Sequence, residues 1–487
     1  MFCRVAEIVK RLNLDLDFIS SGTCVDYSPV NGERIASFPL SDAEHIRTVV
    51  KRSKKAFEEW RLVETMKRSD LLRTFGEELR VHKEVLAELI VIETGKIYAT
   101  ALREVERSIE ICDVIADMQY RMSGFSVPTQ GRNLSVSEVW QPIGPVVVIT
   151  SFNFPLRVWV LNALLALVCG NSVIWRPSRK ASLAAFAINT LLRRAKARTA
   201  VDCPEYLSQV VICDHENALA LAESPDVSLL CATGSPVMAR DMQSRVGQRL
   251  GRSILSIGGN NAAVVTRSAD LDLTTENVLL STISDAGQRC TSLHRLFCHS
   301  SIYDECVSRL KHAFNTVYVN SPFERQSQIG PLIDKEAYDI MCSQLERAKQ
   351  EGGIVSGGNR MDVGKHEKAY YVQPAIVEMP KQTETVKTEL LAPVLYVMRY
   401  DDLKEAVAEV NAFSQTLLAG IFSNDLKETG YFCSMDGVQS DAAIVNGGMF
   451  GYDMAAMFTS GKDARSFATD LWRPFMQSKT CLTNYNF

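Results

Sequence analysis

Short apolar runs of strand length alternate with stretches of helical periodicity along most of this 487-residue chain, and this alternation constrains the fold more than any other feature. The first series predicts strands at 145–150, 172–176, 209–213, 227–232 and 253–257, with helices at 156–169 and 183–197. Repeated strand–helix units place helices on both faces of a mostly parallel sheet. We therefore expect an α/β fold whose first part is doubly wound, as in nucleotide-binding domains.

The alternation restarts after Gly259, which predicts a second α/β domain. This series predicts strands at 293–299, 370–377 and 392–400 and helices at 303–315 and 337–350. Two charged helices, at 43–59 and 67–93, precede the first series. A polar hairpin at 127–140 and an alternating tail at 479–486 belong to neither sheet. A chain of this length exceeds one core, so two or three domains are expected.

Charge and cysteine content exclude several classes of protein. The chain carries 53 basic and 57 acidic residues, a balance that gives no positive field for nucleic acid. Its 13 cysteines form no CxxC pair, zinc-type spacing or disulfide framework, so we expect a reducing compartment and no metal site. Charged residues interrupt residues 1–14, unlike a signal peptide, and the apolar run at 163–169 is too short to cross a bilayer. These features predict a cytoplasmic protein without a nucleic-acid or membrane partner.

Three short segments carry the chemistry. They are residues 151–155 (SFNFP), 255–261 (LSIGGNN) and 285–291 (DAGQRCT). Together they resemble the aldehyde dehydrogenase superfamily, and the GGNN and GQRCT wording is most like its antiquitin branch, which oxidises α-aminoadipic semialdehyde. The resemblance covers nearly the whole chain.

The resemblance also implies how the chain is divided. A cofactor-binding domain would comprise residues 1–125 and 144–257, and a catalytic domain residues 258–450. In the superfamily, segments like those at 126–143 and 471–487 pair into a platform for oligomerisation. A homodimer or homotetramer is therefore expected.

Cys290 is implied as the nucleophile, with Asn153 as its partner. An aldehyde carbon is attacked by a thiolate, so Arg289 or a nearby helix start should supply a positive field. The side-chain amide of Asn153 and the backbone N–H of Cys290 would stabilise the oxyanion. Loss of hydride to a nicotinamide then leaves a thioester. By contrast, apolar surroundings indicate structural thiols at Cys112, Cys169, Cys231 and Cys481.

One catalytic residue of the family is replaced. Where members carry a glutamate that activates water for thioester hydrolysis, this chain has Ser256, which cannot take a proton at neutral pH. The family's C-terminal glutamate is absent as well, because residues 465–467 read RSF, and the glycine-rich loop before it has become MAAMF at 454–458. Three functions remain open: an aldehyde dehydrogenase with another base, an acyl transferase to an acceptor such as coenzyme A, and a degenerate paralogue without turnover.

The cofactor is expected to be NAD or NADP, although no GxGxxG fingerprint follows a strand. The resemblance implies that Thr150 and Ser151, at a strand end, and Gly234 and Ser235, at a helix start, hold the nucleotide. A helix start offers free N–H groups and a positive dipole to a phosphate.

At other positions implied to bind the cofactor, some residues differ from those usual in the family. Arg176 and Ser178 match the segment that grips the adenosine ribose, with arginine in place of the usual lysine. Arg179 stands where NAD-preferring members carry a glutamate, which makes NADP acceptable unless both arginines are merely solvated. Glu389 matches the glutamate that accepts the nicotinamide-ribose hydroxyls, unless it is an exposed charge, and Leu391 replaces an aromatic residue.

Two residues are implied to contact the small-molecule aldehyde. Arg289 corresponds to the arginine that reads the substrate carboxylate in the antiquitin branch. Arg107 stands where that branch carries a glutamate that reads the substrate amino group. An amino-acid semialdehyde is therefore one candidate substrate among other aldehydes.

Overall fold

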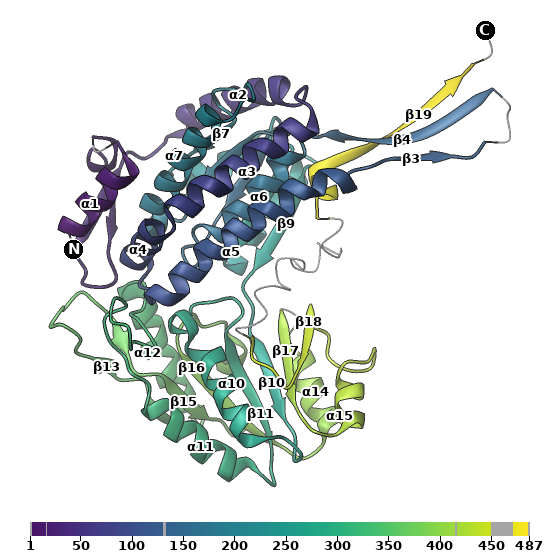
Figure 1. Ribbon diagram of the computed structural model, residues 1–487. Coiled ribbons are helices and arrows are strands. Elements are labelled where there is room, and N and C mark those ends of the chain that lie inside the picture. The colour runs from purple at the N-terminus through teal and green to yellow at the C-terminus, as the bar shows by residue number, and fades with distance from the viewer. Residues whose placement is uncertain (1, 16, 130–132, 414–415, 450–470, 486–487) are drawn as a thin grey trace.

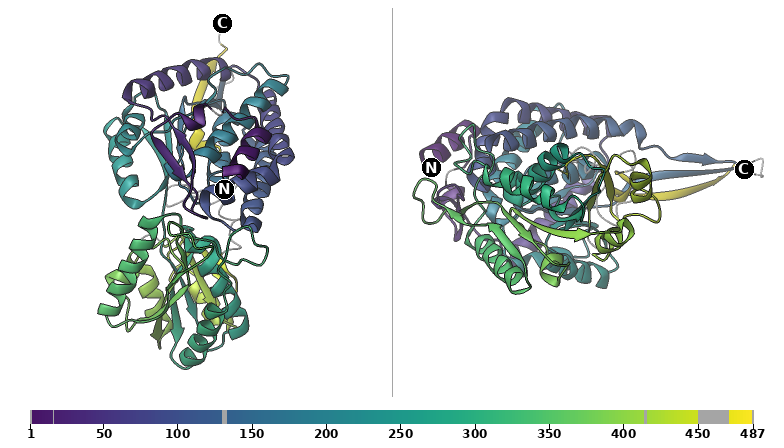
Figure 2. Two further views of the ribbon diagram at one scale, coloured as in Figure 1. Left: turned by 90° about the vertical axis from the view of Figure 1, so that its left-hand side faces the viewer. Right: turned by 90° about the horizontal axis from the view of Figure 1, so that it is seen from below.

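The computed structural model describes residues 2–15, 17–129, 133–413, 416–449 and 471–485. Figures 1 and 2 show two α/β bodies, one above the other, and a long ribbon of strands that extends from the upper body. The upper body is built mainly from the N-terminal half of the chain and the lower body from the C-terminal half. Among the helices of the described ranges, none has the length and apolar character that a membrane span requires.

Five parallel strands form the sheet of the upper body, in the order β7-β6-β5-β8-β9. Their bounds are β5 Val146–Ile149, β6 Val173–Arg176, β7 Ser208–Val210, β8 Leu229–Gly234 and β9 Arg252–Ile257. The connecting helices are α6 (Arg157–Val168), α7 (Ser182–Arg198), α8 (His215–Glu223) and α9 (Pro236–Gln248). The doubly wound arrangement predicted from the sequence is confirmed.

The central strand β5 is buried on both faces. Its side chains alternate, so Val146 and Val148 pack in the core formed with α6, α7 and the N-terminal helices, while Val147 and Ile149 face the core of α2, α8 and α9. The N-terminal helices are α1 (Phe2–Leu12), α2 (Ala43–Trp60), α3 (Thr65–Val81), α4 (Lys83–Thr94) and α5 (Tyr98–Asp117). Burial on both faces explains why PVVVIT is a continuous apolar run.

A seven-stranded sheet in the order β12-β15-β16-β11-β10-β17-β18 forms the lower body. Every neighbouring pair is parallel except β12 and β15. The strands are β10 Asn261–Val265, β11 Leu293–His299, β12 Ile354–Gly357, β15 Ala375–Glu378, β16 Val394–Tyr400, β17 Leu418–Phe422 and β18 Ala442–Val445. The helices are α10 (Leu271–Ile283), α11 (Tyr303–Asn315), α12 (Lys335–Gln350), α13 (Glu384–Lys387), α14 (Leu403–Asn411) and α15 (Leu426–Phe432). The second α/β series expected after Gly259 is thus present.

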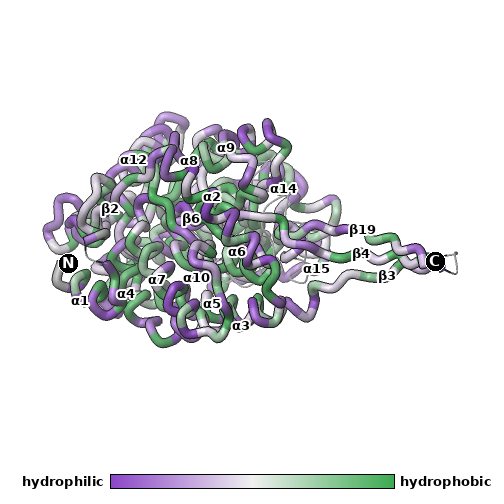
Figure 3. Tube along the Cα trace, turned by 90° about the horizontal axis from the view of Figure 1, so that it is seen from above, coloured by the Kyte–Doolittle hydropathy of each residue, from purple (hydrophilic) through white to green (hydrophobic). Residues whose placement is uncertain are grey.

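The ribbon is a separate three-stranded sheet, in the order β19-β4-β3. Strand β19 (Met476–Asn484) pairs antiparallel with β4 (Leu134–Pro142) along its whole length, and β3 (Phe125–Val127) pairs with the other edge of β4. Figure 3 shows the ribbon projecting beyond the rest of the molecule. The prediction that hairpin and tail lie outside both main sheets is confirmed.

Two short sheets, β1 (Cys24–Tyr27) with β2 (Arg34–Phe38) and β13 (Arg360–Met361) with β14 (Tyr371–Val372), complete the fold.

Several predicted elements differ from the structure. The single helix expected at 67–93 is two helices, α3 and α4, because His82 between them has non-helical φ −109° and ψ 17°. The strand expected at 370–377 is two strands of different sheets, β14 and β15, divided at Pro374, which has no N–H to donate to a ladder. Strand β10 was not predicted.

Candidate active site

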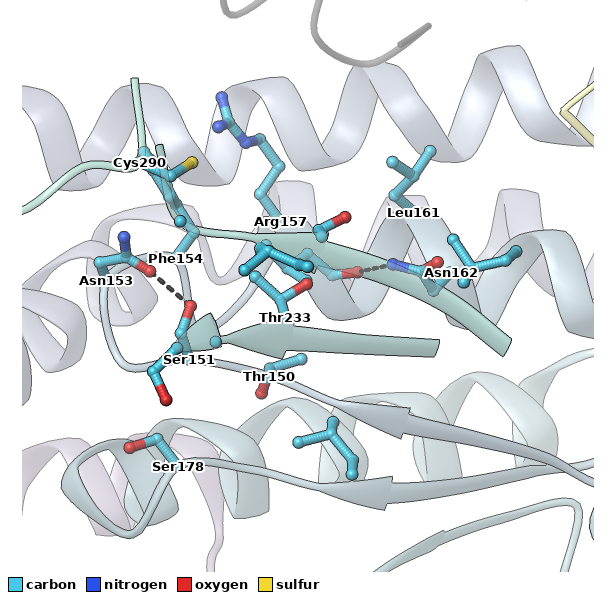
Figure 4. Close-up of a pocket in the computed structure, with 18 of the residues that line it drawn as sticks. Thr150, Ser151, Asn153, Phe154, Arg157, Leu161, Asn162, Ser178, Thr233 and Cys290 are labelled. Carbon is cyan, nitrogen blue, oxygen red and sulfur yellow. Dashed lines mark hydrogen bonds between the residues drawn. The ribbon is translucent and has the colours of Figure 1, made fainter. Parts of the chain in front are cut away.

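A cavity of about 490 Å³ lies at the carboxyl ends of the upper strands β5, β6, β8 and β9. This edge is where open α/β sheets bind ligands. Figure 4 shows Cys290 on one side of the cavity and Ser178 on the other, with Thr150 and Ser151 between them. Asn153, the fifth predicted residue labelled in Figure 4, lies near Ser151 and Cys290.

The segment that carries Cys290 begins with a tight left-handed turn. Asp285, Ala286 and Gly287 have successive φ values of 51°, 57° and 68°. For the two residues that are not glycine, this conformation costs about 1–2 kcal/mol each. A Cβ on Gly287 would lie 2.3 Å from the carbonyl oxygen of Ala392, so only glycine fits there. The turn leaves Cys290 half-buried at the cavity wall.

The two asparagines of the GGNN segment anchor the loops of the site, a role that sequence reasoning missed. The amide nitrogen of Asn261 donates to the Cys290 carbonyl at 2.8 Å. The amide nitrogen of Asn260 donates to the carbonyl of Val386, at 2.7 Å, in the helix just before Glu389. This one segment therefore holds in place both the nucleophile loop and the Glu389 loop.

Asn153 is oriented from both ends of its side chain. Its Oδ1 accepts a hydrogen bond from the Ser151 hydroxyl at 2.5 Å, and its Nδ2 donates to the Gln288 carbonyl at 2.9 Å. An amide nitrogen carries two N–H bonds, so one remains for a ligand in the cavity that Asn153 lines. The arrangement suits an oxyanion donor next to Cys290.

Arg289 lies in a buried ionic network behind the nucleophile. Its Nε donates to Asp285 Oδ2 at 2.6 Å, and Lys96 lies 3.7 Å from the same oxygen. Lys96 also pairs with Glu104. Although burial alone would raise it, the charges of Arg289 and Lys96 lower the pKa of Asp285 to about 2. Arg289 is thus balanced by a fixed anion and is not among the described residues that line the cavity.

Glu104 connects this network to the loop of Asn153. Its Oε1 accepts the backbone N–H groups of Leu156 and Arg157, at 3.1 and 3.2 Å, where α6 begins. A carboxylate at a helix start is favoured by the helix dipole. Glu104, Lys96 and Asp285 were not identified from the sequence, because their meeting depends on tertiary packing.

Ser256 and Glu389 both line the cavity. A Cβ built on Gly258 would lie 1.9 Å from Glu389 Oε1, so the Glu389 carboxylate occupies the space that the missing side chain leaves. No hydrogen bond or ion pair joins that carboxylate to another residue in the described part of the chain. Burial raises the pKa of Glu389 to about 7. Leu391 lines the cavity nearby, as an apolar surface.

The residues expected to hold the nucleotide lie at one strand end and one helix start. Strand β8 ends at Gly234, and Ser235 is the N-cap of α9, with its hydroxyl accepting the N–H of Met238. Both line the cavity, as do Thr150, whose hydroxyl accepts a hydrogen bond from the Trp175 indole at 3.0 Å, and Ser151. A strand end and a helix start, where backbone N–H groups lack helical partners, therefore border one space.

The predicted adenosine-side residues divide into two groups. Arg176 and Ser178 line the cavity, and Arg176 donates to the Cys213 carbonyl at 3.1 Å. Arg179 is exposed and is not one of the described lining residues. Lys180, which was not predicted, lines the cavity and pairs with Asp334 at 2.5 Å. Arg176 and Lys180 are thus both cations of the cavity wall.

Arg107 is not brought to this cavity. It lies on α5 and pairs with Glu110 of the same helix at 2.5 Å. Arg157, which was not predicted, lines the cavity instead and stacks over Phe154, 4.1 Å from the ring centroid. The replaced segments at 454–458 and 465–467 lie outside the described residues.

Burial separates Cys290 from most other thiols. Cys112, Cys169 and Cys231 are buried, and burial raises the pKa of each. Cys481 was expected to be buried too, but it lies on the projecting ribbon and is partly exposed. Three of the four thiols expected to be structural are therefore in the core.

Comparison with known proteins agrees with this geometry. Residues 18–452 match the aldehyde dehydrogenase family. The chain is 33% identical to α-aminoadipic semialdehyde dehydrogenase of Bos taurus over 472 residues, which cover 94% of this chain and 85% of that protein. It is 32% identical to aldehyde dehydrogenase family 7 member A1 of Pisum sativum over 469 residues, with coverage of 94% and 90%.

Solved structures show the same fold. HpcC of Thermus thermophilus superposes with a TM-score of 0.90 at 23% identity, covering 99% of this chain and 96% of that one. Betaine aldehyde dehydrogenase of Staphylococcus aureus, solved with NAD⁺, superposes with a TM-score of 0.89 at 19% identity, covering 99% and 98%. The chain belongs to the aldehyde dehydrogenase family, a family of NAD(P)-dependent oxidoreductases.

Proposed function

We propose that this protein oxidises an aldehyde to a carboxylic acid with NAD or NADP, through a thioester on Cys290. One observation carries the proposal: Cys290, Asn153 and the helix start at Ser235 line a single cavity. A nucleophile, an oxyanion donor and a phosphate-type site in one space are the parts that this reaction needs.

The chain's own residues account for acylation. The Cys290 thiolate attacks the aldehyde carbon, and the carbonyl oxygen becomes an oxyanion. The second N–H of the Asn153 amide and the backbone N–H of Cys290 stabilise that charge, and one such donor is typically worth about 10²–10³ in rate. Asn261 fixes the Cys290 carbonyl and so keeps the loop in position. Bound NAD(P) supplies the acceptor for the hydride that leaves as the thioester forms.

The residues present fit a dinucleotide. Gly234 and Ser235 would hold a phosphate at the start of α9, and Arg176 and Ser178 would hold the adenosine ribose. Glu389 is an acceptor-only group when ionised and suits the hydroxyls of a second ribose. With Lys180 in the wall and no acidic residue among 176–180, the site would accept the 2′-phosphate of NADP.

The substrate proposed is an aldehyde that is apolar around its reacting carbon. The mammalian relatives are named for α-aminoadipic semialdehyde, and Arg289 is retained. Here, however, Arg289 is paired with Asp285, and Arg107 lies on α5 outside the cavity. Many of the described lining residues are apolar, including Phe152, Phe154, Leu161, Leu165 and Leu391. These features favour an apolar aldehyde over an amino-acid semialdehyde, which remains the second candidate.

A cytoplasmic location and a homodimer or homotetramer belong to the same proposal. Twelve cysteines of the described ranges are free thiols, which suits a reducing compartment. In the part of the chain that the structure describes, the ribbon has two outer edges, on β3 and β19, to which no further strand is bonded, and such edges suit pairing with a second subunit.

Trapping the acyl-enzyme tests the proposal. The protein is incubated with an aldehyde and NAD or NADP, quenched in acid, digested and mapped by mass spectrometry. The expected result is an acyl group on the Cys290 peptide that requires both nucleotide and aldehyde. A degenerate paralogue would give no adduct, and an acyl transferase would lose the adduct faster when coenzyme A is added.

A further inference from the structure

Hydrolysis of the proposed thioester needs a base, and few groups in the cavity can serve. The position where a glutamate is expected holds Ser256. Among the described residues that line the cavity, two carry carboxylates, Glu389 and Asp441. Asp441 is exposed, whereas Glu389 is half-buried. No histidine occurs among the described lining residues.

Glu389 lies against the segment that carries Ser256. Gly258 follows Ser256 by two residues, just past the end of β9. The Glu389 carboxylate fills the space directly above Gly258, and all three residues line the cavity. A carboxylate is therefore present in the cavity two residues along the chain from position 256, which no longer provides one.

The environment of this carboxylate suits proton transfer. It has no hydrogen-bond or ion-pair partner in the described part of the chain, so when no ribose occupies the site its lone pairs can accept a hydrogen bond from a water. Burial raises the pKa of Glu389 to about 7. General bases work best when their pKa lies near the operating pH.

We propose that Glu389 is the general base that activates water against the Cys290 thioester, an inference that rests on the proposed function. The Glu389 carboxylate takes one proton from a water molecule as its oxygen bonds to the acyl carbon. The carbon–sulfur bond then breaks, the Cys290 thiolate leaves, and a carboxylic acid is released. Glu389 returns its proton to solvent, and no oxidant or reductant is consumed.

An ester substrate tests this step without nucleotide, and so separates it from any role of Glu389 in holding a ribose. Para-nitrophenyl acetate acylates a reactive thiol and releases p-nitrophenol, which gives a burst, while the steady rate reports deacylation by water. The variants are Glu389→Gln, the matched carboxylate control Asp441→Asn, and Cys290→Ala. We expect Glu389→Gln to keep the burst amplitude and to deacylate about 10²-fold more slowly, in the range typical of a lost general base.

Two further readouts distinguish a base from a structural residue. Wild-type deacylation should rise with pH through about 7 and then level off, as the Glu389 carboxyl ionises, and the profile of Glu389→Gln should lack this rise. Hydroxylamine, which attacks a thioester without a base, should restore the rate of Glu389→Gln to that of the wild type.

The outcomes that overturn the inference are distinct from failure of the proposed function. Deacylation of Glu389→Gln within twofold of the wild type, or a wild-type rate that does not change between pH 6 and 8.5, removes Glu389 as the base. The second result decides even if Glu389→Gln does not fold. Absence of a burst in the wild type, or a burst that persists in Cys290→Ala, instead removes the Cys290 thioester itself.

Discussion

Asp285 Oδ2 accepts a hydrogen bond from Arg289 Nε at 2.6 Å, inside the turn that leads to Cys290. The pair is buried and Lys96 lies on its other side. The negative charge of Asp285 neutralises the guanidinium of Arg289, which therefore attracts a substrate carboxylate only weakly. The pair therefore accounts for the preference proposed here for apolar aldehydes.

Replacing Asp285 by asparagine should shift this preference. Asp285→Asn keeps the shape of the side chain but leaves Arg289 without its anion, so KM for an aldehyde that carries a carboxylate should fall by roughly tenfold, about 1.4 kcal/mol. KM for an apolar aldehyde should change little. Steady-state kinetics with the two substrates measures the effect, and an equal change for both would contradict the proposed neutralisation.

Placing glutamate at position 256 should accelerate turnover. Ser256→Glu adds a second carboxylate to the cavity wall beside that of Glu389, so the gain should be smaller than the roughly 10²–10⁴ that a first general base is worth in rate. The gain should appear in the steady-state rate and not in the rate of acylation. If Ser256→Glu is no faster and the wild type already turns over at about 10 s⁻¹, deacylation is not the limiting step.

The buried carboxyls of Asp26 and Glu93 predict a dependence of stability on pH. Burial raises the pKa of Asp26 from 3.8 to about 6, and burial together with the neighbouring Asp26 raises the pKa of Glu93. Groups with raised pKa contribute stability at low pH that is lost as pH rises through the folded value. Asp26 thus makes the protein less stable at pH 7 than at pH 5, by an amount on the order of 1–3 kcal/mol.

Asp26→Asn tests this directly, because an amide can donate to Glu93 and carries no charge. The variant should raise the melting temperature at pH 8 and give less or no gain at pH 5. Asp70→Asn, at an exposed position, is the control and should change neither value. A loss of stability for Asp26→Asn at pH 8 would show that the pair is not under electrostatic strain.

The projecting ribbon predicts assembly. Phe125, Leu482 and Tyr485 are exposed apolar side chains on it or at its end, and no further strand of the described residues bonds to the outer edge of β3 or of β19. Sedimentation at micromolar concentration should show a dimer or tetramer. Deletion of residues 479–487 should dissociate it or make it insoluble, whereas a wild-type monomer would contradict the proposed oligomer.

Strands that bury apolar side chains on both faces could be predicted from the sequence. Strand β5 is apolar on both faces, so its run stands out, and the Gly234–Ser235 helix start follows from its cap residue. Strand β10 was missed because its short run, NAAVV, follows directly on the glycine motif.

The contacts between residues of the candidate site could not be predicted from the sequence. The Asp285–Arg289 pair depends on a left-handed turn at residues that usually avoid it. The contact of Glu389 with Gly258 joins segments 131 residues apart, 389 minus 258, and the sequence gives no sign of that distance. Motifs identified the reacting residues, whereas the groups that set their charge emerged only from packing.

Pre-steady-state production of NAD(P)H tests the central claim most directly. Wild-type protein is mixed in a stopped-flow instrument with NAD or NADP and a panel of aldehydes, with Cys290→Ala as the control. A thioester that forms faster than it hydrolyses predicts a burst of about one NAD(P)H per subunit, followed by a slower steady rate, and no NAD(P)H from Cys290→Ala. The absence of both burst and steady-state NAD(P)H in a wild type that binds the nucleotide, or an equal yield from Cys290→Ala, would contradict it.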